Sequence, residues 1–200
     1  MPPIMPPLYF LRHGETEWNR VGRLQGHRDS PLTEKGRKQA ALMASILLRE
    51  LGPRPAFRLV SSPLGRARQT AGFVSEALDL PIETDPRLAE LTMGSWDGMT
   101  RAEIEAGWPA CLVGATDRDW NFRSPDGESA EDIRRRASAW LQTVTQPTIA
   151  VAHGLLGKIL RGTYAGLDLE AALHQSEPQD IVFRLHGGKI DRLTGDDLAA

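Results

Sequence analysis

Two arginines and two histidines stand at or just after the ends of three short apolar runs in this 200-residue chain. Arg12 and His13 close the first run, Arg66 follows the second, and His153 comes directly after the third. An imidazole can act as a nucleophile or a proton donor near neutral pH. A guanidinium presents a planar fork of donors that suits phosphate or carboxylate oxygens. Together these side chains could bind and attack an anion; the alternative for each histidine is a hydrogen bond to backbone.

The elements that would position these residues alternate between strands and helices. Apolar runs predict strands at 8–11, 57–61, 82–84, 148–152, 181–185 and 189–193, and amphipathic stretches predict helices at 34–51, 64–78, 129–144 and 155–164. This alternation predicts an α/β fold, a three-layer α/β/α sandwich whose central sheet is mainly parallel. Ligands bind outside the carboxyl ends of such strands, where the two arginines and two histidines fall.

Length and composition limit the number of domains and the class of protein that the chain can form. A chain of 200 residues fits a single domain spanning residues 1–200, and 40% hydrophobic with 25% charged residues is an ordinary globular composition. No run approaches the roughly 20 apolar residues of a membrane span, and residues 1–11 lack the pattern of a signal peptide. The single cysteine, Cys111, excludes an internal disulfide. We therefore expect a cytoplasmic protein.

The charges are distributed unevenly along the chain. The net charge of −2 argues against a general nucleic-acid binder. Residues 1–70 nevertheless hold 12 Lys and Arg against 5 Asp and Glu, so the basic excess lies in the same part of the chain as Arg12 and Arg66. Scattered surface charge is the alternative interpretation.

Four sequence blocks occur in order along the chain. The first is 11–19 (LRHGETEWN), continued by 24–26 (LQG) and 31–36 (PLTEKG); the second is 62–71 (SPLGRARQTA); the third is 88–91 (LAEL) with 94–98 (GSWDG); the fourth is 151–154 (VAHG). Over about residues 8–160 they resemble the histidine phosphatase superfamily, in its phosphoglycerate-mutase-like branch. Four ordered blocks make this a specific match.

The resemblance implies catalysis through a phosphohistidine. His13 would be the nucleophile, and Arg12 and Arg66 would hold the phosphoryl oxygens by charge-assisted hydrogen bonds. His153 would add a further donor to the transferring group. Glu90 would protonate the leaving oxygen and then activate the attacking water. The alternative for Glu90 is a surface carboxylate.

The resemblance also implies a phosphate-binding set around these five residues. It comprises Asn19, Gln25, Gly26 and Gly154. The alternative for Asn19 and the Gln25-Gly26 turn is loop capping. No cofactor is implied, and no metal, because arginine and histidine supply the positive charge and the histidines lack a metal-ligand spacing.

Phosphatases and mutases both occur in this family. The stretch after Glu90 lacks the Arg-His-Tyr sequence and the following Asn-Lys by which the mutases resemble one another. It is similar to the phosphatase members, as is the Gly-Glu-Ser at 127–129, although those members often carry Glu in place of Asp97. We therefore expect a metal-independent phosphomonoesterase that acts on small phosphate esters. A phosphoglycerate mutase is the first alternative, and a catalytically silent member that binds phosphorylated ligands is the second.

A long connection follows the Glu90 block. Residues 92–128 are expected to form a lid or insert over the site, and Trp108, Trp120 and Phe122 lie among arginines in its centre. Such residues suit a sizeable or planar leaving group, while small phosphorylated metabolites stay open. Alternatively, the aromatic residues pack a small helix onto the domain. The expected partner is a small-molecule phosphate ester, not a nucleic acid or a membrane, and the sequence does not choose between a monomer and a homodimer.

Overall fold

A six-stranded sheet lies at the centre of the computed structural model, which describes residues 5–196. The strands are β1 (Leu8–Arg12), β2 (Arg58–Ser61), β3 (Ile82–Thr84), β4 (Thr148–Ala152), β5 (Val182–His186) and β6 (Lys189–Leu193). Their order across the sheet is β3-β2-β4-β1-β5-β6. The first four strands in that order pair in parallel, whereas β5 pairs antiparallel with both β1 and β6. The sheet is therefore mixed and mostly parallel.

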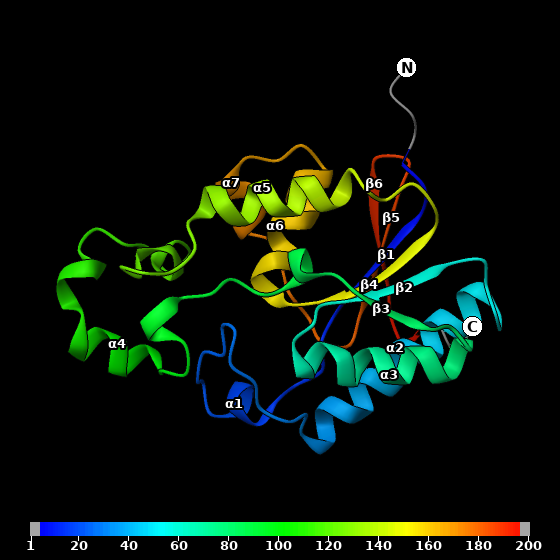
Figure 1. The fold of residues 1–200 in the computed structure, drawn as a ribbon, viewed down its shortest axis with the longest axis horizontal. Coiled ribbons are helices and arrows are strands. Elements are labelled where there is room, and N and C mark those ends of the chain that lie inside the picture. Colours follow the sequence, from blue (N-terminus) through cyan, green and yellow to red (C-terminus); the bar gives the residue numbers. More distant parts are fainter. Residues whose placement is uncertain (1–4, 197–200) are drawn as a thin grey trace.

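Helices cover both faces of the sheet and complete three layers (Figure 1). The α-helices are α1 (Glu17–Arg20), α2 (Glu34–Leu51), α3 (Gly65–Leu78), α4 (Arg101–Gly107), α5 (Ala130–Leu141), α6 (Gly154–Tyr164) and α7 (Leu169–Leu173). Short 3-10 turns lie at Pro86–Leu88, Gly94–Trp96, Pro109–Leu112 and Trp120–Arg123. Helices α2 and α3 pack on one face, and α5, α6 and α7 on the other. The α4 region projects to the side of these layers.

The expected fold class is confirmed, with differences confined to short elements and helix ends. The hairpin strand expected at 181–185 occupies Val182–His186, and the helix expected over 129–144 ends at Leu141. Helices α1, α4 and α7 were not predicted because each has seven residues or fewer, too short for a helical period to show. The predicted N-cap of α2 is observed, since the Thr33 side chain accepts from the Gly36 N–H.

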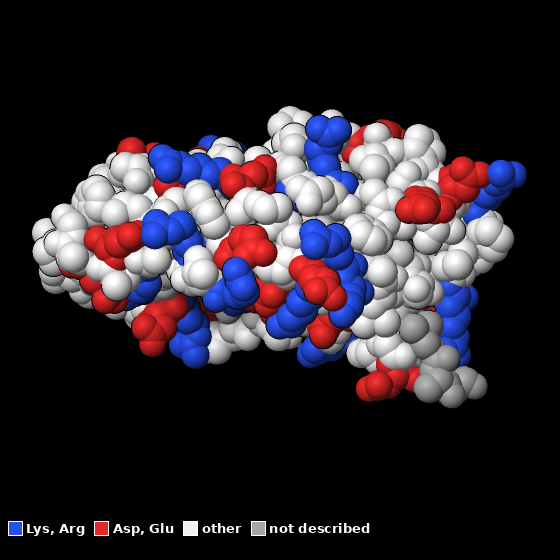
Figure 2. All heavy atoms as spheres, turned by 90° about the horizontal axis from the view of Figure 1, so that it is seen from below, with Lys and Arg blue, Asp and Glu red and all other residues white. Residues whose placement is uncertain are grey.

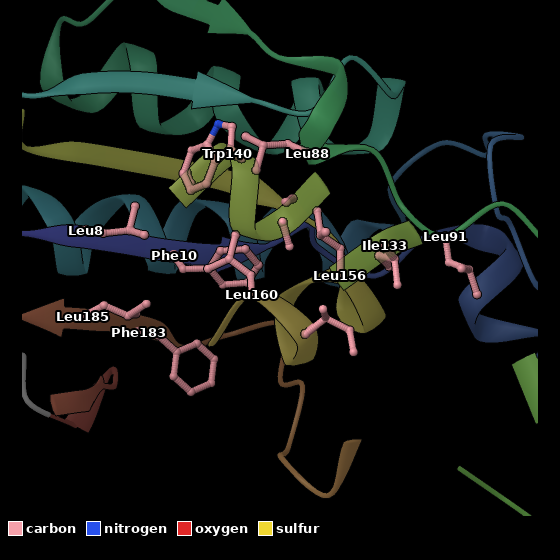
Figure 3. Packing of buried hydrophobic residues seen from close by; sticks show 14 of the residues in the cluster. Leu8, Phe10, Leu88, Leu91, Ile133, Trp140, Leu156, Leu160, Phe183 and Leu185 are labelled. Atoms are coloured by element: carbon pink, nitrogen blue, oxygen red, sulfur yellow. The ribbon is translucent and has the colours of Figure 1, made fainter. Parts of the chain in front are cut away.

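Alternating side chains of the strands feed two hydrophobic cores. On β1, Leu8 and Phe10 face the α5–α6 side and Tyr9 and Leu11 face the α2–α3 side, as the two-residue period of a strand requires. Figure 3 shows the first core, to which Phe10 of β1 and Leu160 of α6 both contribute. Burial on both faces fixes the register of the central strands.

This topology brings three strand ends together. In the parallel register Arg12 lies opposite Ala152, and Ser61 lies opposite Val151, so β1, β4 and β2 end side by side. The residues that follow each strand share one edge of the sheet. His13 is tied to this edge by its N–H, which donates to the Ala152 carbonyl.

The outer surface carries charges of both signs. On the face shown in Figure 2, basic and acidic side chains lie interspersed among uncharged ones. Many charged side chains of the protein form ion pairs, such as Arg54 with Asp79 and Arg58 with Glu83. Within residues 5–196, no helix has the length and apolar character needed to cross a membrane.

Candidate active site

A cavity of about 360 Å³ opens at the carboxyl edge of the parallel strands. Its lining includes most of the residues that the sequence singled out: Arg12, His13, Asn19, Gln25, Gly26, Arg66, Glu90 and Gly154. His153 completes the group from a fully buried position, where its ring centroid lies 5.2 Å from that of His13. The structure therefore brings all nine expected residues to one place.

His13 is held as a neutral imidazole with one nitrogen free. Its Nδ1 lies 2.8 Å from the Gly14 carbonyl oxygen. A carbonyl oxygen only accepts, so Nδ1 carries the proton and Nε2 keeps its lone pair. Burial, together with the positive charges of Arg66 and Arg12, holds the pKa of His13 well below its usual value. These conditions suit a nucleophile at neutral pH.

His153 is oriented by Ser62, which follows β2. The Ser62 Oγ accepts from the Leu64 N–H at 3.2 Å and lies 2.7 Å from His153 Nε2. When the Ser62 hydroxyl donates to Nε2, the proton of the neutral imidazole is on Nδ1. That Nδ1 is buried and has no hydrogen-bond partner among the described residues. Burial and nearby positive charges hold the pKa of His153 well below its usual value, so the ring offers a neutral donor.

Arg12 and Arg66 each keep one buried nitrogen unpaired. Their Nε atoms have no hydrogen-bond partner within residues 5–196, whereas Arg12 Nη1 and both Nη atoms of Arg66 donate to backbone carbonyls. Arg66 donates to the Gly26 carbonyl at 2.8 Å and to Asp29 Oδ1 at 2.8 Å. Each guanidinium is therefore held in place by the protein, while its Nε–H stays available as a hydrogen-bond donor. Buried unpaired donors are costly in a native fold and call for an acceptor such as an anion.

Glu90 reaches the site from an irregular segment. Its carboxylate accepts from the N–H groups of Leu155 and Leu156 at 3.1 and 2.9 Å. These are among the first N–H groups of α6, the positive end of that helix dipole. Its own carbonyl accepts from Arg136 Nη2 at 3.1 Å. The carboxylate is therefore fixed at the cavity wall rather than free at the surface.

The remaining expected residues combine capping with cavity lining. Asn19 forms a capping box with Thr16, and Gln25 Oε1 accepts from Ser30 Oγ at 3.2 Å, yet both side chains line the cavity. Gly26 has φ +49, and a Cβ there would lie 1.7 Å from Asp97 Oδ1. A side chain is therefore excluded at Gly26.

Residues 5–196 contain no cluster of three or more His, Cys, Asp or Glu side chains placed to hold a metal ion. Of the three aromatic residues in the 99–124 segment, Trp120 lines the cavity. Trp108 and Phe122 are partly buried against the core, and Trp108 packs edge-on against Trp96 with centroids 6.2 Å apart. All three aromatic residues thus pack against the core, and Trp120 also lies at the cavity.

Comparison with known proteins matches the chain to a family. A family model described as Histidine phosphatase superfamily (branch 1) matches residues 8–193. The chain belongs to this superfamily. It is 38% identical over 177 residues to a Yersinia pestis (strain Pestoides F) protein named "Probable phosphoglycerate mutase GpmB", covering 84% of this chain and 78% of the relative.

Solved structures of this superfamily share the fold. A mycobacterial glucosyl-3-phosphoglycerate phosphatase in complex with VO3 is 30% identical with a TM-score of 0.77, covering 94% of this chain and 96% of that one. YhfR of Bacillus stearothermophilus is 29% identical with a TM-score of 0.79, covering 93% and 94% of the two chains. Proteins named as phosphatase and as mutase are thus both similar to this superfamily member.

A segment that the sequence did not indicate, residues 175–179 between α7 and β5, supports the site and is here termed the brace. Its Glu177 carbonyl accepts from Arg12 Nη1 at 2.5 Å. Its Gln179 Nε2 donates to the His13 carbonyl at 3.2 Å and to Asn19 Oδ1 at 3.1 Å. Arg161, a buried residue of α6, anchors the brace by donating to the Ser176 carbonyl at 2.6 Å. No sequence pattern marks Gln179, because it lies in an irregular segment.

Replacing Gln179 with alanine is expected to loosen the phosphate-binding loop without removing a reacting group. We expect inhibition by inorganic phosphate to weaken about threefold to tenfold, since two hydrogen bonds of about 1 kcal/mol each hold His13 and Asn19 in place. Steady-state kinetics with phosphate as inhibitor measures this. The control is Gln146→Ala, a residue outside the cavity lining. Unchanged phosphate inhibition in the Gln179 variant would contradict the bracing role.

The two buried histidines predict a loss of stability in acid. Unfolding exposes both imidazoles, which then bind protons with the ordinary pKa of about 6.5, whereas the folded state keeps them neutral because their pKa values are lowered. The stability they contribute is therefore fully present above about pH 6.5 and decreases as the pH falls below it. Urea unfolding at pH 7.5 and 5.5 should show a steeper decrease for the wild type than for His13→Gln/His153→Gln. Parallel decreases would contradict neutral histidines in the folded protein.

Proposed function

We propose that this protein is a metal-independent phosphomonoesterase that works through a phosphohistidine at position 13. The observation that carries the proposal is the neutral His13, with its proton committed to Gly14, beside the unpaired buried nitrogens of Arg12, Arg66 and His153. One free lone pair and three donors are what attack on a phosphoryl group requires. The phosphatases similar to this chain support the same activity.

In the first step, His13 Nε2 attacks phosphorus and the bond from phosphorus to the ester oxygen breaks in line. Arg12, Arg66 and His153 donate to the equatorial oxygens, where negative charge is spread in the transition state. Glu90 gives its proton to the departing ester oxygen, which leaves as a neutral alcohol. The products of this step are the alcohol, ionised Glu90 and phosphorylated His13.

In the second step, water takes the place of the alcohol. Glu90 accepts one proton from the water as its oxygen attacks phosphorus, and the bond between phosphorus and Nε2 breaks. Inorganic phosphate is released, and His13 and Glu90 regain their starting protonation. The N–H groups of Leu155 and Leu156 keep the Glu90 carboxylate in one position for both proton transfers.

A phosphoglycerate mutase is the second candidate, favoured by the 38% identity to the Yersinia pestis relative with that name. A mutase returns the phosphoryl group to a bound phosphoglycerate instead of to water. The segment after Glu90, with Thr92 and Met93 bonded to the Asp97 carboxylate, differs from the mutase sequence pattern and supports hydrolysis. All five proposed reacting residues are present, which argues against a catalytically silent member.

A phosphate-release assay tests the proposal directly. Purified protein is incubated with an aryl phosphate and with 3-phosphoglycerate, each with and without a chelator, and 2-phosphoglycerate formation is followed with a bisphosphorylated primer present. We expect phosphate release that the chelator does not change. Rapid isomerisation with negligible hydrolysis would identify a mutase, and loss of hydrolysis on chelation would contradict the metal-independent mechanism.

Glu90→Gln is expected to slow the hydrolysis of esters with poor leaving groups much more than that of esters with good leaving groups. The amide cannot protonate the ester oxygen, so hydrolysis of alkyl phosphates should fall about 100-fold to 10,000-fold, the usual contribution of general acid catalysis. An aryl phosphate with an acidic phenol needs no such proton and should lose much less in its first step. Pre-steady-state release of the phenol, compared with alkyl ester turnover, measures the difference. Equal losses for both substrates would show that Glu90 is not the proton donor.

A further inference from the structure

A buried threonine of α3 is hydrogen-bonded to the backbone next to His13, and the mechanism proposed above does not use it. Thr70 is fully buried and does not line the cavity. Its Oγ1 donates to the Arg66 carbonyl at 3.0 Å and accepts from the Gly14 N–H at 3.1 Å. A carbonyl only accepts and an N–H only donates, so the direction of both hydrogen bonds is fixed. Thr70 therefore connects the helix that carries Arg66 to the loop that carries His13.

The peptide group between His13 and Gly14 is held at both of its polar atoms. Its N–H donates to Thr70, and its carbonyl accepts from Gln179 Nε2 at 3.2 Å. Just before this group, the His13 N–H donates to the Ala152 carbonyl at 3.0 Å. The peptide group is planar, so it cannot turn without breaking one of these hydrogen bonds.

The next peptide group, between Gly14 and Glu15, contains the acceptor for the His13 ring. Its carbonyl lies 2.8 Å from His13 Nδ1, and its N–H donates to Gln39 Oε1 at 2.9 Å. The first of these contacts keeps the proton of the neutral ring on Nδ1 and leaves the lone pair on Nε2. The two peptide groups meet at the Gly14 Cα, so a displacement of the first moves the second. The position of the acceptor therefore depends on Thr70.

Steric contact alone does not fix this backbone. A Cβ at Gly14 would lie 2.2 Å from the Gly36 carbonyl oxygen, so the loop packs closely against the first turn of α2. Such a contact resists closer approach but not separation, which only the hydrogen bonds of the loop resist. Gly14 is buried, and its N–H would lose its acceptor without the Thr70 hydroxyl. An unpaired buried N–H is costly, so the loop would shift toward another acceptor.

We propose that Thr70 is a positioning residue, which holds the Gly14 backbone where its carbonyl keeps the His13 proton on Nδ1. Thr70 touches no reacting atom and acts through His13. Without the Thr70 hydroxyl, a larger share of the His13 rings carries the proton on Nε2, which then has no lone pair for attack on phosphorus. The effect on turnover rests on the phosphohistidine mechanism proposed above, whereas the effect on the ring proton does not.

NMR of the His13 ring nitrogens tests the positioning role without any substrate. Protein isotopically labelled on its histidine ring nitrogens is compared as wild type, Thr70→Ser and Thr70→Val, and the His13 signals are those absent from His13→Gln. Valine has nearly the shape of threonine but no hydroxyl. We expect well-separated Nδ1 and Nε2 shifts in the wild type and in Thr70→Ser, and shifts that move toward each other in Thr70→Val. Unchanged shifts in Thr70→Val would overturn the inference, whatever its activity.

Kinetics separates loss of the nucleophile from damage to the site. Thr70→Val should lower kcat/KM for an aryl phosphate about tenfold, because a misplaced reacting group attacks slowly. Inhibition by inorganic phosphate should change by less than about twofold, because binding uses the donors of Arg12, Arg66 and His153 and not the lone pair of His13. Thr70→Ser should recover most of the lost rate. Parallel losses of turnover and phosphate inhibition in Thr70→Val would indicate a merely structural role and overturn the inference.

The matched control is Thr163→Val on α6. The Thr163 Oγ1 donates to the Ile159 carbonyl at 2.8 Å, the same bond to the preceding turn that Thr70 makes, but it does not line the cavity. This variant should change neither readout.

A further variant covers the case in which Thr70→Val does not fold, as checked by a thermal unfolding scan. The thiol of Thr70→Cys is a weak donor and acceptor, so its ring shifts and turnover should lie between those of Thr70→Ser and of a variant without hydrogen bonding. Identical behaviour of the serine and cysteine variants would overturn the inference. Altered His13 shifts with unchanged turnover would support the positioning role and contradict the phosphohistidine mechanism instead.

Discussion

Replacing His13 with alanine should lower kcat for every phosphate ester by more than about a thousandfold, because the nucleophile is lost. No other described side chain combines a free lone pair with this position. The Nδ1 proton of His13 is committed to Gly14 at 2.8 Å, and the neighbouring imidazole of His153 is engaged by Ser62 at 2.7 Å. Steady-state kinetics on an aryl phosphate measures the loss, and a thermal unfolding scan checks that the variant is folded.

The matched control is His186→Ala, at the exposed end of β5. It removes an imidazole far from the cavity lining and should leave kcat within twofold. A His13→Gln variant keeps polar bulk at the site and should be as inactive as the alanine variant. If either His13 variant retains near-normal turnover, the covalent mechanism is wrong, whatever the substrate.

Arg66→Ala should cost about 2–4 kcal/mol of transition-state stabilisation, the usual effect of losing a preorganised electrostatic contact. That range corresponds to roughly 30-fold to 900-fold in kcat/KM. Arg66 is 1% exposed, and its Nε has no hydrogen-bond partner within residues 5–196, so water screens its charge little. Kinetics with an aryl phosphate measures the contribution of Arg66 to the transition state, and inhibition by inorganic phosphate measures its contribution to phosphate binding.

Arg66 also supports the loop that carries Gly26. A second variant therefore separates this structural role from the contact with the phosphoryl group. Arg66→Lys keeps a positive charge but cannot reproduce the planar fork that reaches Gly26 and Asp29. It should recover part of the lost rate. Arg68→Ala, two residues further on α3 and exposed, is the control and should have no effect. Full activity in Arg66→Ala would exclude a contact with the phosphoryl group.

The strand-end residues of the site could be predicted from the sequence because parallel strands end on a common edge. Arg12, His13 and His153 each lie at or directly after a strand, so their proximity follows from recognising the strands. Ser62 obeys the same rule, yet its role toward His153 emerged only from the structure, because a serine after a strand has many ordinary uses. The buried faces of α2 and α5 could also be predicted from the sequence, because their apolar residues recur with a helical period.

Glu90 and Gln179 could not be placed by such reasoning. Glu90 lies after a 3-10 turn, and its position depends on backbone N–H groups of Leu155 and Leu156, more than 60 residues away. Resemblance to a family was the one indication of it. Gln179 lies in the brace, whose path depends on Arg161, a buried cation of α6. Long-range contacts of irregular segments leave no local pattern in the sequence.

Trapping the phosphorylated protein tests the central claim most directly. The protein is mixed with an aryl phosphate, quenched in alkali within milliseconds, digested and examined by mass spectrometry, with Glu90→Gln used to slow the attack by water. The mechanism predicts one phosphoryl group on the peptide that contains His13, stable in alkali and lost in acid, and none in His13→Ala. Turnover of the aryl phosphate with phosphate on another residue, or with no phosphorylated peptide at any time, would contradict it.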